Sequence, residues 1–396
     1  MPDFQKLSAD YQQALLRQVV PFWLKNSRDE QCGGYFDTLS ATGGVIEGDK
    51  FVTTQAQQAW AFAWLYNTFD GQPDWLTHAR HGGNFLRSFA HTDSLDGYAR
   101  LDRRGRPLEP TTNLVPACSV VMAYVQLHRA TGEDEWAILA KRTFDRLLQR
   151  REEIRAQHRK IIGGSWQVCH LSEATVLLKT GLDMQPLLDE ESGKAALDTV
   201  LHEIMHEFVD RRTDILREYI LPEGAFINTP EGRRLNVGLT FRTAGYLIDL
   251  CARNGNQKIT TQAVTWCLRM CEQAWDEATG GLDQYIDLKN QPFIFPDARQ
   301  KWAWVQVEAI SCLIKGNVQT RNPDCLKWFK RIHEYTFAYF SDQKHSSWHV
   351  VIDQHRQPLL SAKATPETGC FSLIKCLTET AQALTRCGQL KPVDRT

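Results

Sequence analysis

The chain has 396 residues, of which 42% are hydrophobic, and its formal net charge is −1. The apolar fraction suffices for a large core, and the near-neutral charge gives no electrostatic reason to expect binding to nucleic acid or to a membrane. No Pro-, Ser- or Gly-rich linker divides the sequence. We therefore expect a single domain over residues 1–396.

The start of the chain, residues 1–6, lacks the basic-then-apolar order of a signal peptide, and no stretch is apolar enough to span a bilayer. The 11 cysteines are scattered, odd in number and without a CxxC pair. This usage is typical of reduced, buried thiols. We expect a cytoplasmic protein, a monomer or homodimer, that needs no metal and no other cofactor.

Helical periodicity recurs along the whole chain. Apolar residues spaced three and four apart predict twelve helices in six pairs, over about 7–27, 51–69, 74–90, 112–131, 134–155, 165–180, 190–211, 236–253, 258–274, 299–316, 322–341 and 364–388. Short alternating segments between the pairs predict β-hairpins.

One turn pattern, an Asp followed by four residues and a Pro, occurs three times along the chain. The copies begin at Asp102, Asp287 and Asp353, and a weaker copy begins at Ser40. The intervals 102 − 40 = 62 and 353 − 287 = 66 indicate a period near 62–66 residues. Such a period predicts six units of one supersecondary motif.

Six helix pairs can close into an all-α (α/α)6 barrel, a toroid with short β-hairpins in its connecting loops. Closure lets each unit bury its apolar face against two neighbours, whereas an open superhelix needs polar capping units. The second helix of each pair would then line a central funnel where a ligand binds. These inner helices are about 51–69, 112–131, 165–180, 236–253, 299–316 and 364–388.

Two of the expected inner helices carry polar and aromatic stripes. In the first, Trp166, His170 and Glu173 share one face, and an imidazole beside a carboxylate can transfer protons near neutral pH. In the second, Lys301 and Glu308 flank Trp304, whose indole could stack on a sugar ring. The alternatives are a structural histidine and a plain amphipathic helix.

The segment His202-Glu203-Ile204-Met205-His206 matches the HExxH pattern of zinc peptidases. Its helix has an ordinary apolar face and belongs to the expected outer layer, away from the funnel. We therefore expect no metal there, and a zinc protein remains a minor alternative.

Several collinear motifs resemble the N-acylglucosamine 2-epimerase family. They are Gly33-Gly34-Tyr35-Phe36-Asp37, Lys50-Phe51-Val52, Arg129-Ala130-Thr131-Gly132, Gly280-Gly281-Leu282, Lys301-x-x-Trp304-x-Gln306-x-Glu308-Ala309 and the run from Lys363 to Phe371. The resemblance implies an (α/α)6 barrel that acts as a sugar 2-epimerase or an aldose–ketose isomerase.

The resemblance also implies removal of the C2 proton of an open-chain sugar, generally by two histidines. At the matching positions this chain has Leu239 and Ser372. Arg242 stands where the family has a glutamate, and Gln57 where it has an arginine. His170 matches a histidine of the isomerase branch.

We therefore expect a sugar isomerase or epimerase that acts at C2 of an open-chain monosaccharide. His170, oriented by Glu173, would be one proton-transfer group, and Glu308, with a pKa raised by burial, the other. Arg242 could bind an anionic substrate such as a sugar acid. The expected substrate-binding residues are Trp166, Asn236, Arg242, Lys301, Trp304, Lys363 and Gln57.

Two other functions remain open at this point. The chain could be a sugar-binding or regulatory descendant without activity. It could also be a glycoside hydrolase or lyase on the same toroid, with Glu173 and Glu308 as its carboxylate pair.

Overall fold

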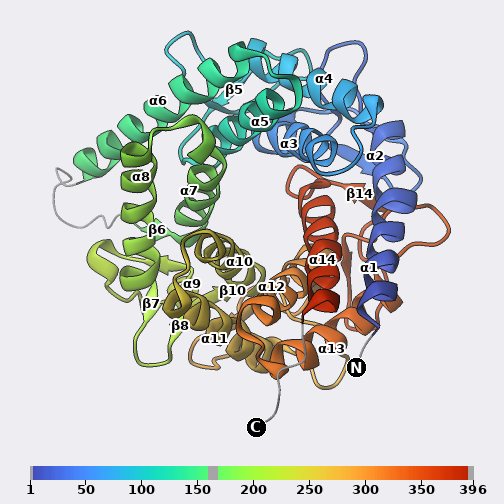
Figure 1. The fold of residues 1–396 in the computed structure, drawn as a ribbon, viewed down its shortest axis with the longest axis vertical. Coiled ribbons are helices and arrows are strands. Elements are labelled where there is room, and N and C mark those ends of the chain that lie inside the picture. The colour runs from blue at the N-terminus through green and yellow to red at the C-terminus, as the bar shows by residue number, and fades with distance from the viewer. Residues whose placement is uncertain (1–2, 159–167, 391–396) are drawn as a thin grey trace. The chain divides into compact units, whose positions relative to one another are not determined.

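A computed structural model describes residues 3–158 and 168–390. The chain divides into two compact units. Unit 1 comprises Met1–Phe22, Leu235–Leu360 and Ser372–Thr396, and unit 2 comprises Trp23–Arg234 and Ser361–Phe371. Both consist mainly of helices (Figure 1). The single domain expected over residues 1–396 stays a prediction.

Unit 2 contains two layers of helices (Figure 1). The helices that follow a strand pack side by side as α3 (Val52–Thr68), α5 (Val115–Thr131) and α7 (Leu171–Met184). The second layer packs against them as α4 (Pro73–Phe89), α6 (Asp134–His158) and α8 (Glu190–His202). Four fully buried alanines on α3 (Ala56, Ala59, Ala61 and Ala63) give this helix a smooth surface for close packing.

Unit 1 has the same alternation of helices. One set consists of α10 (Val237–Asn254), α12 (Ala303–Thr320) and α14 (Phe371–Gln389), and α10 packs on α12. The outer partners are α11 (Gln257–Ala274) and α13 (Pro323–Tyr339). The N-terminal segment runs through α1 (Phe4–Gln13), a π-helical stretch (Ala14–Val19) and α2 (Val20–Asn26). Ser8 and Tyr11 of α1 bond to Ala381 and His333, which ties the N-terminus to α14 and α13.

Short strands join the helices, together with the brief helix α9 (Pro230–Arg233). The antiparallel sheet β14-β1-β2 uses Ala362–Ala364, Thr38–Ser40 and Val45–Ile46, and β3-β4-β5 uses Lys50–Phe51, Tyr98–Leu101 and Pro107–Pro110. The two-stranded sheets are β6-β9 (Cys169–His170, Tyr219–Ile220), β7-β8 (Val209–Asp210, Ile215–Leu216), β10-β11 (Arg234–Asn236, Tyr285–Asp287) and β12-β13 (Lys301–Trp302, Val351–Ile352).

All twelve predicted helices have counterparts among the described residues, but several begin later than predicted. The helix expected from 165 begins at Leu171, and the one expected from 299 begins at Ala303. The preceding residues, His170 and Trp302, are extended because they pair in β6 and β12. Strand pairing therefore overrides the helical pattern at these junctions.

The Asp-x4-Pro turns share one hydrogen-bonding scheme. The side chain of Asp102 accepts bonds from the N–H groups of Arg104 and Arg106, and the side chains of Asp287 and Asp353 each accept the matching pair. The β4-β5 hairpin closes around the first copy. These contacts confirm the repeated turn predicted from the sequence.

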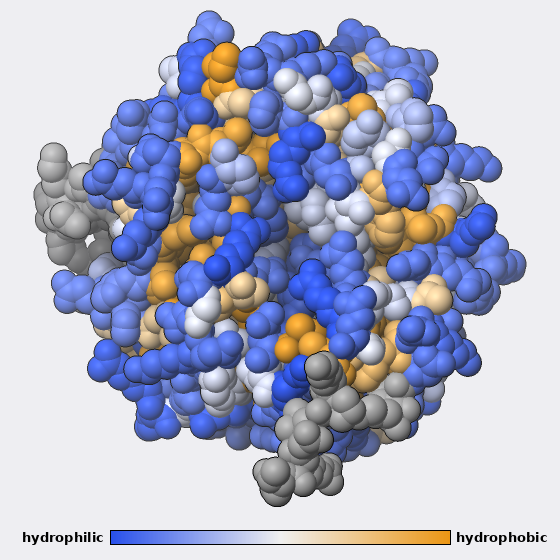
Figure 2. Space-filling model, in the orientation of Figure 1, coloured by the Kyte–Doolittle hydropathy of each residue, from blue (hydrophilic) through white to orange (hydrophobic). Residues whose placement is uncertain are grey.

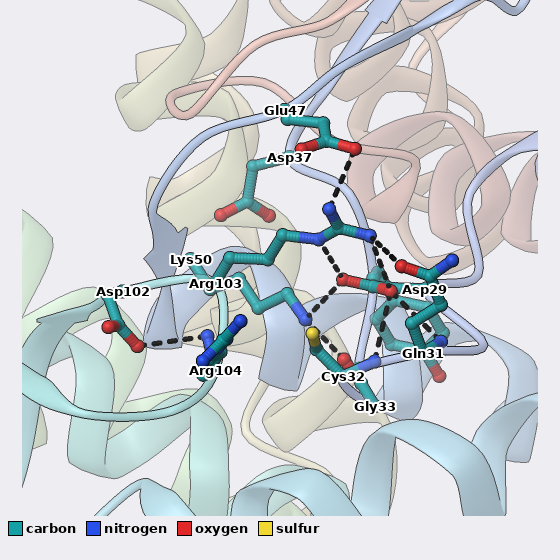
Figure 3. A network of polar contacts seen from close by, with 12 residues as sticks. Asp29, Gln31, Cys32, Gly33, Asp37, Glu47, Lys50, Asp102, Arg103 and Arg104 are labelled. Carbon is teal, nitrogen blue, oxygen red and sulfur yellow. Dashed lines mark hydrogen bonds and ion pairs between the residues drawn. The ribbon is translucent and has the colours of Figure 1, made fainter.

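A buried ion pair anchors the entrance of α3 (Figure 3). Lys50 donates to Asp29 at 3.0 Å, with 1% and 0% of the two side chains exposed, and it also bonds to the carbonyl of Gly33. Asp29 accepts further bonds from the loop N–H of Cys32 and from Arg103 of the β4-β5 turn. One carboxylate therefore joins a loop, a strand and a hairpin.

Unit 1 repeats this ion pair at the entrance of α12. Lys301 donates to Asp276 at 3.1 Å and also contacts Asp283, and its side chain is fully buried. In each unit the side-chain amide of a glutamine, Gln55 or Gln306, bonds to both the backbone N–H and the backbone C=O of one loop residue. The sixfold repeat therefore includes a repeated buried lysine–aspartate pair.

Hydrophilic side chains cover most of the face shown in Figure 2, interrupted by apolar patches. Exposed aliphatic residues include Ile46, Ile138 and Ile294. Within the described residues, no helix is long and apolar enough to cross a membrane.

Replacing Asp29 by Asn should lower the free energy of unfolding at about pH 7 by about 3–5 kcal/mol, because Lys50 would remain buried without a counter-charge. Chemical denaturation measures the change. Burial acts to raise the pKa of Asp29, but bonds from Arg103 and Lys50 lower it to about 2. The native advantage over the variant should therefore shrink as the pH falls from about 4 to about 2.

Asp49→Asn is the matched control, since Asp49 pairs with Arg100 at a site where both side chains are more than a third exposed. It should cost less than about 1 kcal/mol. Equal losses in the two variants would contradict the anchoring role of Asp29.

Candidate active site

His170 lies at the junction between β6 and α7, where it caps the helix. Its Nδ1 accepts a hydrogen bond from the backbone N–H of Ser172 at 2.9 Å. The ring proton therefore belongs on Nε2, which lies 3.3 Å from Glu218. The side chain is 28% exposed, so the ring combines a fixed orientation with access to solvent.

Glu218, which immediately precedes β9, is the centre of a polar cluster. Its carboxylate is 2% exposed and receives two bonds of 2.9 Å from the guanidinium of Arg234. Arg234 also donates to the hydroxyl of Tyr219, whose ring meets the His170 ring edge-on with centroids 4.5 Å apart. The bidentate pair holds the Glu218 carboxylate in place beside the imidazole.

The predicted helical stripe of Trp166, His170 and Glu173 is therefore wrong in its local structure. His170 precedes the helix, and the carboxylate that faces it is Glu218 instead of Glu173, which lies in the first turn of α7. Trp166 lies outside the described residues. Glu218 was missed because pairing between β6 and β9, which are distant in sequence, brings it to His170.

A second polar cluster joins three helices of unit 1. Arg242 of α10 donates from Nε to Glu308 of α12 at 2.8 Å and from Nη2 to Ser372 of α14 at 2.9 Å. Its guanidinium lies 4.9 Å from the ring centre of Trp304. Three of the sequence-predicted site residues, Arg242, Glu308 and Trp304, thus come together within this unit.

Glu308 does not have the raised pKa that we expected. Burial acts to raise the pKa of this carboxyl, but the charges of Lys375 and Arg242 outweigh burial and lower it from its ordinary value. Lys375 of α14 donates to Glu308 at 2.7 Å, and both side chains are 2% exposed. An ionised carboxylate held by two cations is a weak base, and it has no proton to donate near neutral pH.

Asn236 and Trp304 shape the start of α10. The side chain of Asn236 caps the helix by accepting from the N–H of Leu239 at 3.0 Å. The Trp304 ring lies so close to Gly238 that a Cβ there would fall 2.2 Å from it. The glycine therefore permits the indole to pack against the helix and support Arg242.

The other expected binding residues have different settings. Lys301 is fully buried in its pair with Asp276. This burial supports a structural role for Lys301 and argues against direct contact with a sugar. Lys363 is 3% exposed within β14, and Gln57 is partly exposed on α3. Their roles in binding stay predictions.

The HExxH segment has a structural explanation in unit 2. Glu203 is 7% exposed and bonds to Arg151 of α6 at 2.7 Å, so its carboxylate is engaged in an ion pair between helices. The rings of His202 and His206 lie 4.7 Å apart. Among the described residues, no group of three or more His, Cys, Asp or Glu side chains is arranged to hold a metal ion.

Comparison with known proteins relates nearly the whole chain to sugar epimerases. Residues 34–368 match the profile of the N-acylglucosamine 2-epimerase family. The human N-acylglucosamine 2-epimerase is 28% identical over 374 residues, which cover 91% of this chain and 86% of that protein. The rat enzyme is 26% identical over 377 residues, with 93% and 90% covered.

Solved structures share the fold at low sequence identity. The cellobiose 2-epimerase of Spirochaeta thermophila superposes with a TM-score of 0.83 at 16% identity, over 97% of this chain and 98% of that one. A D-mannose isomerase superposes with a TM-score of 0.81 at 16% identity, over 96% and 99%. These similarities confirm the predicted fold class, the (α/α)6 barrel.

The fold and the matched relatives define an isomerase-type enzyme of the sugar epimerase and isomerase class. The chain belongs to the N-acylglucosamine 2-epimerase family. Arg242 and Ser372, which stand where the resemblance led us to expect a glutamate and a histidine, bond to each other.

Replacing Lys375 by Met tests whether Glu308 depends on two cations. We expect the free energy of unfolding at about pH 7 to fall by about 3–5 kcal/mol, because the variant breaks a buried pair. The lowered pKa of Glu308 means that its pairing contributes stability above the ordinary glutamate pKa of about 4.3. The deficit should therefore shrink as the pH falls below that value.

Lys330→Met is the control, since Lys330 lies 3.8 Å from Glu334 and both side chains are exposed. Denaturation should show a change below about 1 kcal/mol. A Lys375 variant as stable as this control would refute the two-cation description of Glu308.

Proposed function

We propose that this protein is an aldose–ketose isomerase that moves a proton between C2 and C1 of an open-chain sugar, with His170 as the proton-transfer residue. One observation carries the proposal: a partly exposed imidazole, held by a backbone N–H and facing a buried carboxylate, in a chain of this family. Glu218 takes the orienting role that we first gave to Glu173.

The chemistry follows from the acidity of the hydrogen at C2. In the open-chain form this hydrogen is α to the C1 carbonyl, so a base can remove it and leave an enediolate. Return of a proton to C1, with transfer of the O2 hydroxyl proton to O1, gives the ketose, and return to the opposite face of C2 gives the epimer. These steps need neither an oxidant nor a reductant, so we propose no cofactor.

Isomerisation is favoured over epimerisation by the number of proton-transfer groups that the reaction needs. Epimerisation removes a proton from one face of C2 and delivers one to the other, whereas isomerisation can use one group on one face. The two family histidine positions hold Leu239 and Ser372, and Glu308 is ionised between two cations. Among the described candidate residues, His170 keeps the chemistry of a proton carrier.

Nε2 of His170 is the nitrogen that would carry the proton. It can accept the C2 proton only when the neutral ring holds its own proton on Nδ1 and gives up the bond from Ser172. Nδ1 is occupied by the N–H of Ser172, while Nε2 faces Glu218 at 3.3 Å, longer than the 2.9 Å bonds between Glu218 and Arg234. The ring can therefore turn toward a substrate without disturbing the Glu218–Arg234 pair. Catalytic contacts of this kind often shorten only when the substrate is bound.

The proposed substrate is a small sugar, in line with relatives named as epimerases of N-acylglucosamine and cellobiose and as an isomerase of mannose. We also propose a cytoplasmic location, which is supported by eleven cysteines that are all free thiols. The monomer or homodimer expected from the sequence stays a prediction.

His170→Asn should lower the exchange of the C2 hydrogen by about 10²–10⁴-fold, because asparagine can still accept from Ser172 but lacks Nε2. NMR of aldoses, ketoses and sugar acids in D2O, with catalytic amounts of enzyme, measures this rate. His128→Asn is the control, since His128 bonds to the carbonyl of Glu133 at the end of α5. It should keep the native rate.

If no sugar in the panel exchanges even at high enzyme concentration, the proposed activity is wrong. Thermal stabilisation by a sugar without exchange would then support the binding protein considered as an alternative. The hydrolase alternative is weakened because ionised Glu308 cannot serve as a general acid near neutral pH.

A further inference from the structure

Arg242 is the most exposed member of the ionic cluster that it forms with Glu308 and Lys375. Its side chain is 23% exposed, whereas Glu308 and Lys375 are each 2% exposed. Two cations and one carboxylate leave one net positive charge on these three residues. Of these three side chains, that of Arg242 is the one most accessible to solvent or a ligand.

The cluster continues along the helices as a row of alternating charges. Lys375 lies 3.9 Å from Glu379, Glu379 lies 3.2 Å from Lys315, and Lys315 lies 2.8 Å from Asp249. Each inner charge has neighbours of opposite sign, which offsets the cost of burying it. Arg242 is the cationic end of this row, and Glu308 is its one carboxylate neighbour within it.

The orientation of Arg242 is fixed from three sides. Nε is held by Glu308, Nη2 by Ser372 and the flat face by Trp304. Among the described residues, Nη1 has no hydrogen-bond partner in the structure. A planar guanidinium that is already ordered loses little freedom when its remaining N–H groups bind an oxygen anion.

We infer that Arg242 binds the anionic group of an acidic sugar, either a carboxylate or a phosphate. This inference rests on the proposed function in that it names the substrate class. A glutamate at this position, as in the family pattern, would repel such a group, whereas the arginine attracts it. Ser372 completes the arrangement because its hydroxyl accepts a hydrogen bond from Arg242.

Binding of glucuronate, glucose 6-phosphate and glucose, measured by calorimetry, tests the inference with the full-length protein. We expect at least one acidic sugar to bind at least about tenfold more tightly than glucose. The preference should disappear in Arg242→Gln and weaken with added salt. The two acidic sugars distinguish a carboxylate from a phosphate, and inorganic phosphate alone reports binding without a sugar.

Two further variants keep the result interpretable. Arg242→Lys retains the charge and its pairing with Glu308 but loses the planar fork, so it should keep only part of the preference. Lys327→Gln removes an exposed charge on α13 and should keep all of it. Circular dichroism verifies that each variant is folded.

The outcomes separate the two proposals. Equal binding of acidic and neutral sugars, or a preference that survives in folded Arg242→Gln, overturns the inference about Arg242. Acidic sugars that bind through Arg242 without any C2 exchange support this inference and overturn the isomerase. Isomerisation restricted to neutral sugars would support the isomerase and overturn the inference about Arg242.

Discussion

The ionised carboxylate of Glu308, buried between Arg242 and Lys375, is the constraint on which the functional account depends. A buried charge persists only when opposite charges surround it, and here two helices supply them. This pairing removes Glu308 from proton transfer, because it lowers the pKa of the carboxyl. The same pairing holds Arg242 in one orientation beside Trp304. We therefore propose an electrostatic role for Arg242 and assign proton transfer to His170.

The scaffold around these residues repeats a small number of buried polar contacts. Buried lysine–aspartate pairs at Asp29 and Asp276 anchor the loops that precede α3 and α12, and glutamines bracket the adjoining backbone. Such pairs restrain loops without enlarging the apolar core. Because strands of two or three residues then lead into the helices, polar side chains such as His170 stand at helix starts. A residue at that position is oriented by the backbone and remains accessible.

Local patterns in the sequence predicted the fold well, and contacts between distant segments explain what they missed. The turns at Asp102 and Asp353 are governed by their own side chains, so their geometry could be predicted. His170 was wrongly placed on a helix because its strand partner, Tyr219, lies far along the chain. Glu218 and Lys375 were missed for the same reason. Lys375 lies one turn beyond Ser372 on α14, so that spacing was the one signal available.

The central claim is that one imidazole moves the proton, which makes this protein an isomerase rather than a two-base epimerase. The most direct test follows the label of an aldose that carries deuterium at C2 while the enzyme works in ordinary water. If His170 acts alone on one face, a measurable share of the deuterium should appear at C1 of the ketose product, and no C2 epimer should form. Formation of the C2 epimer with complete loss of the label to solvent would contradict the account.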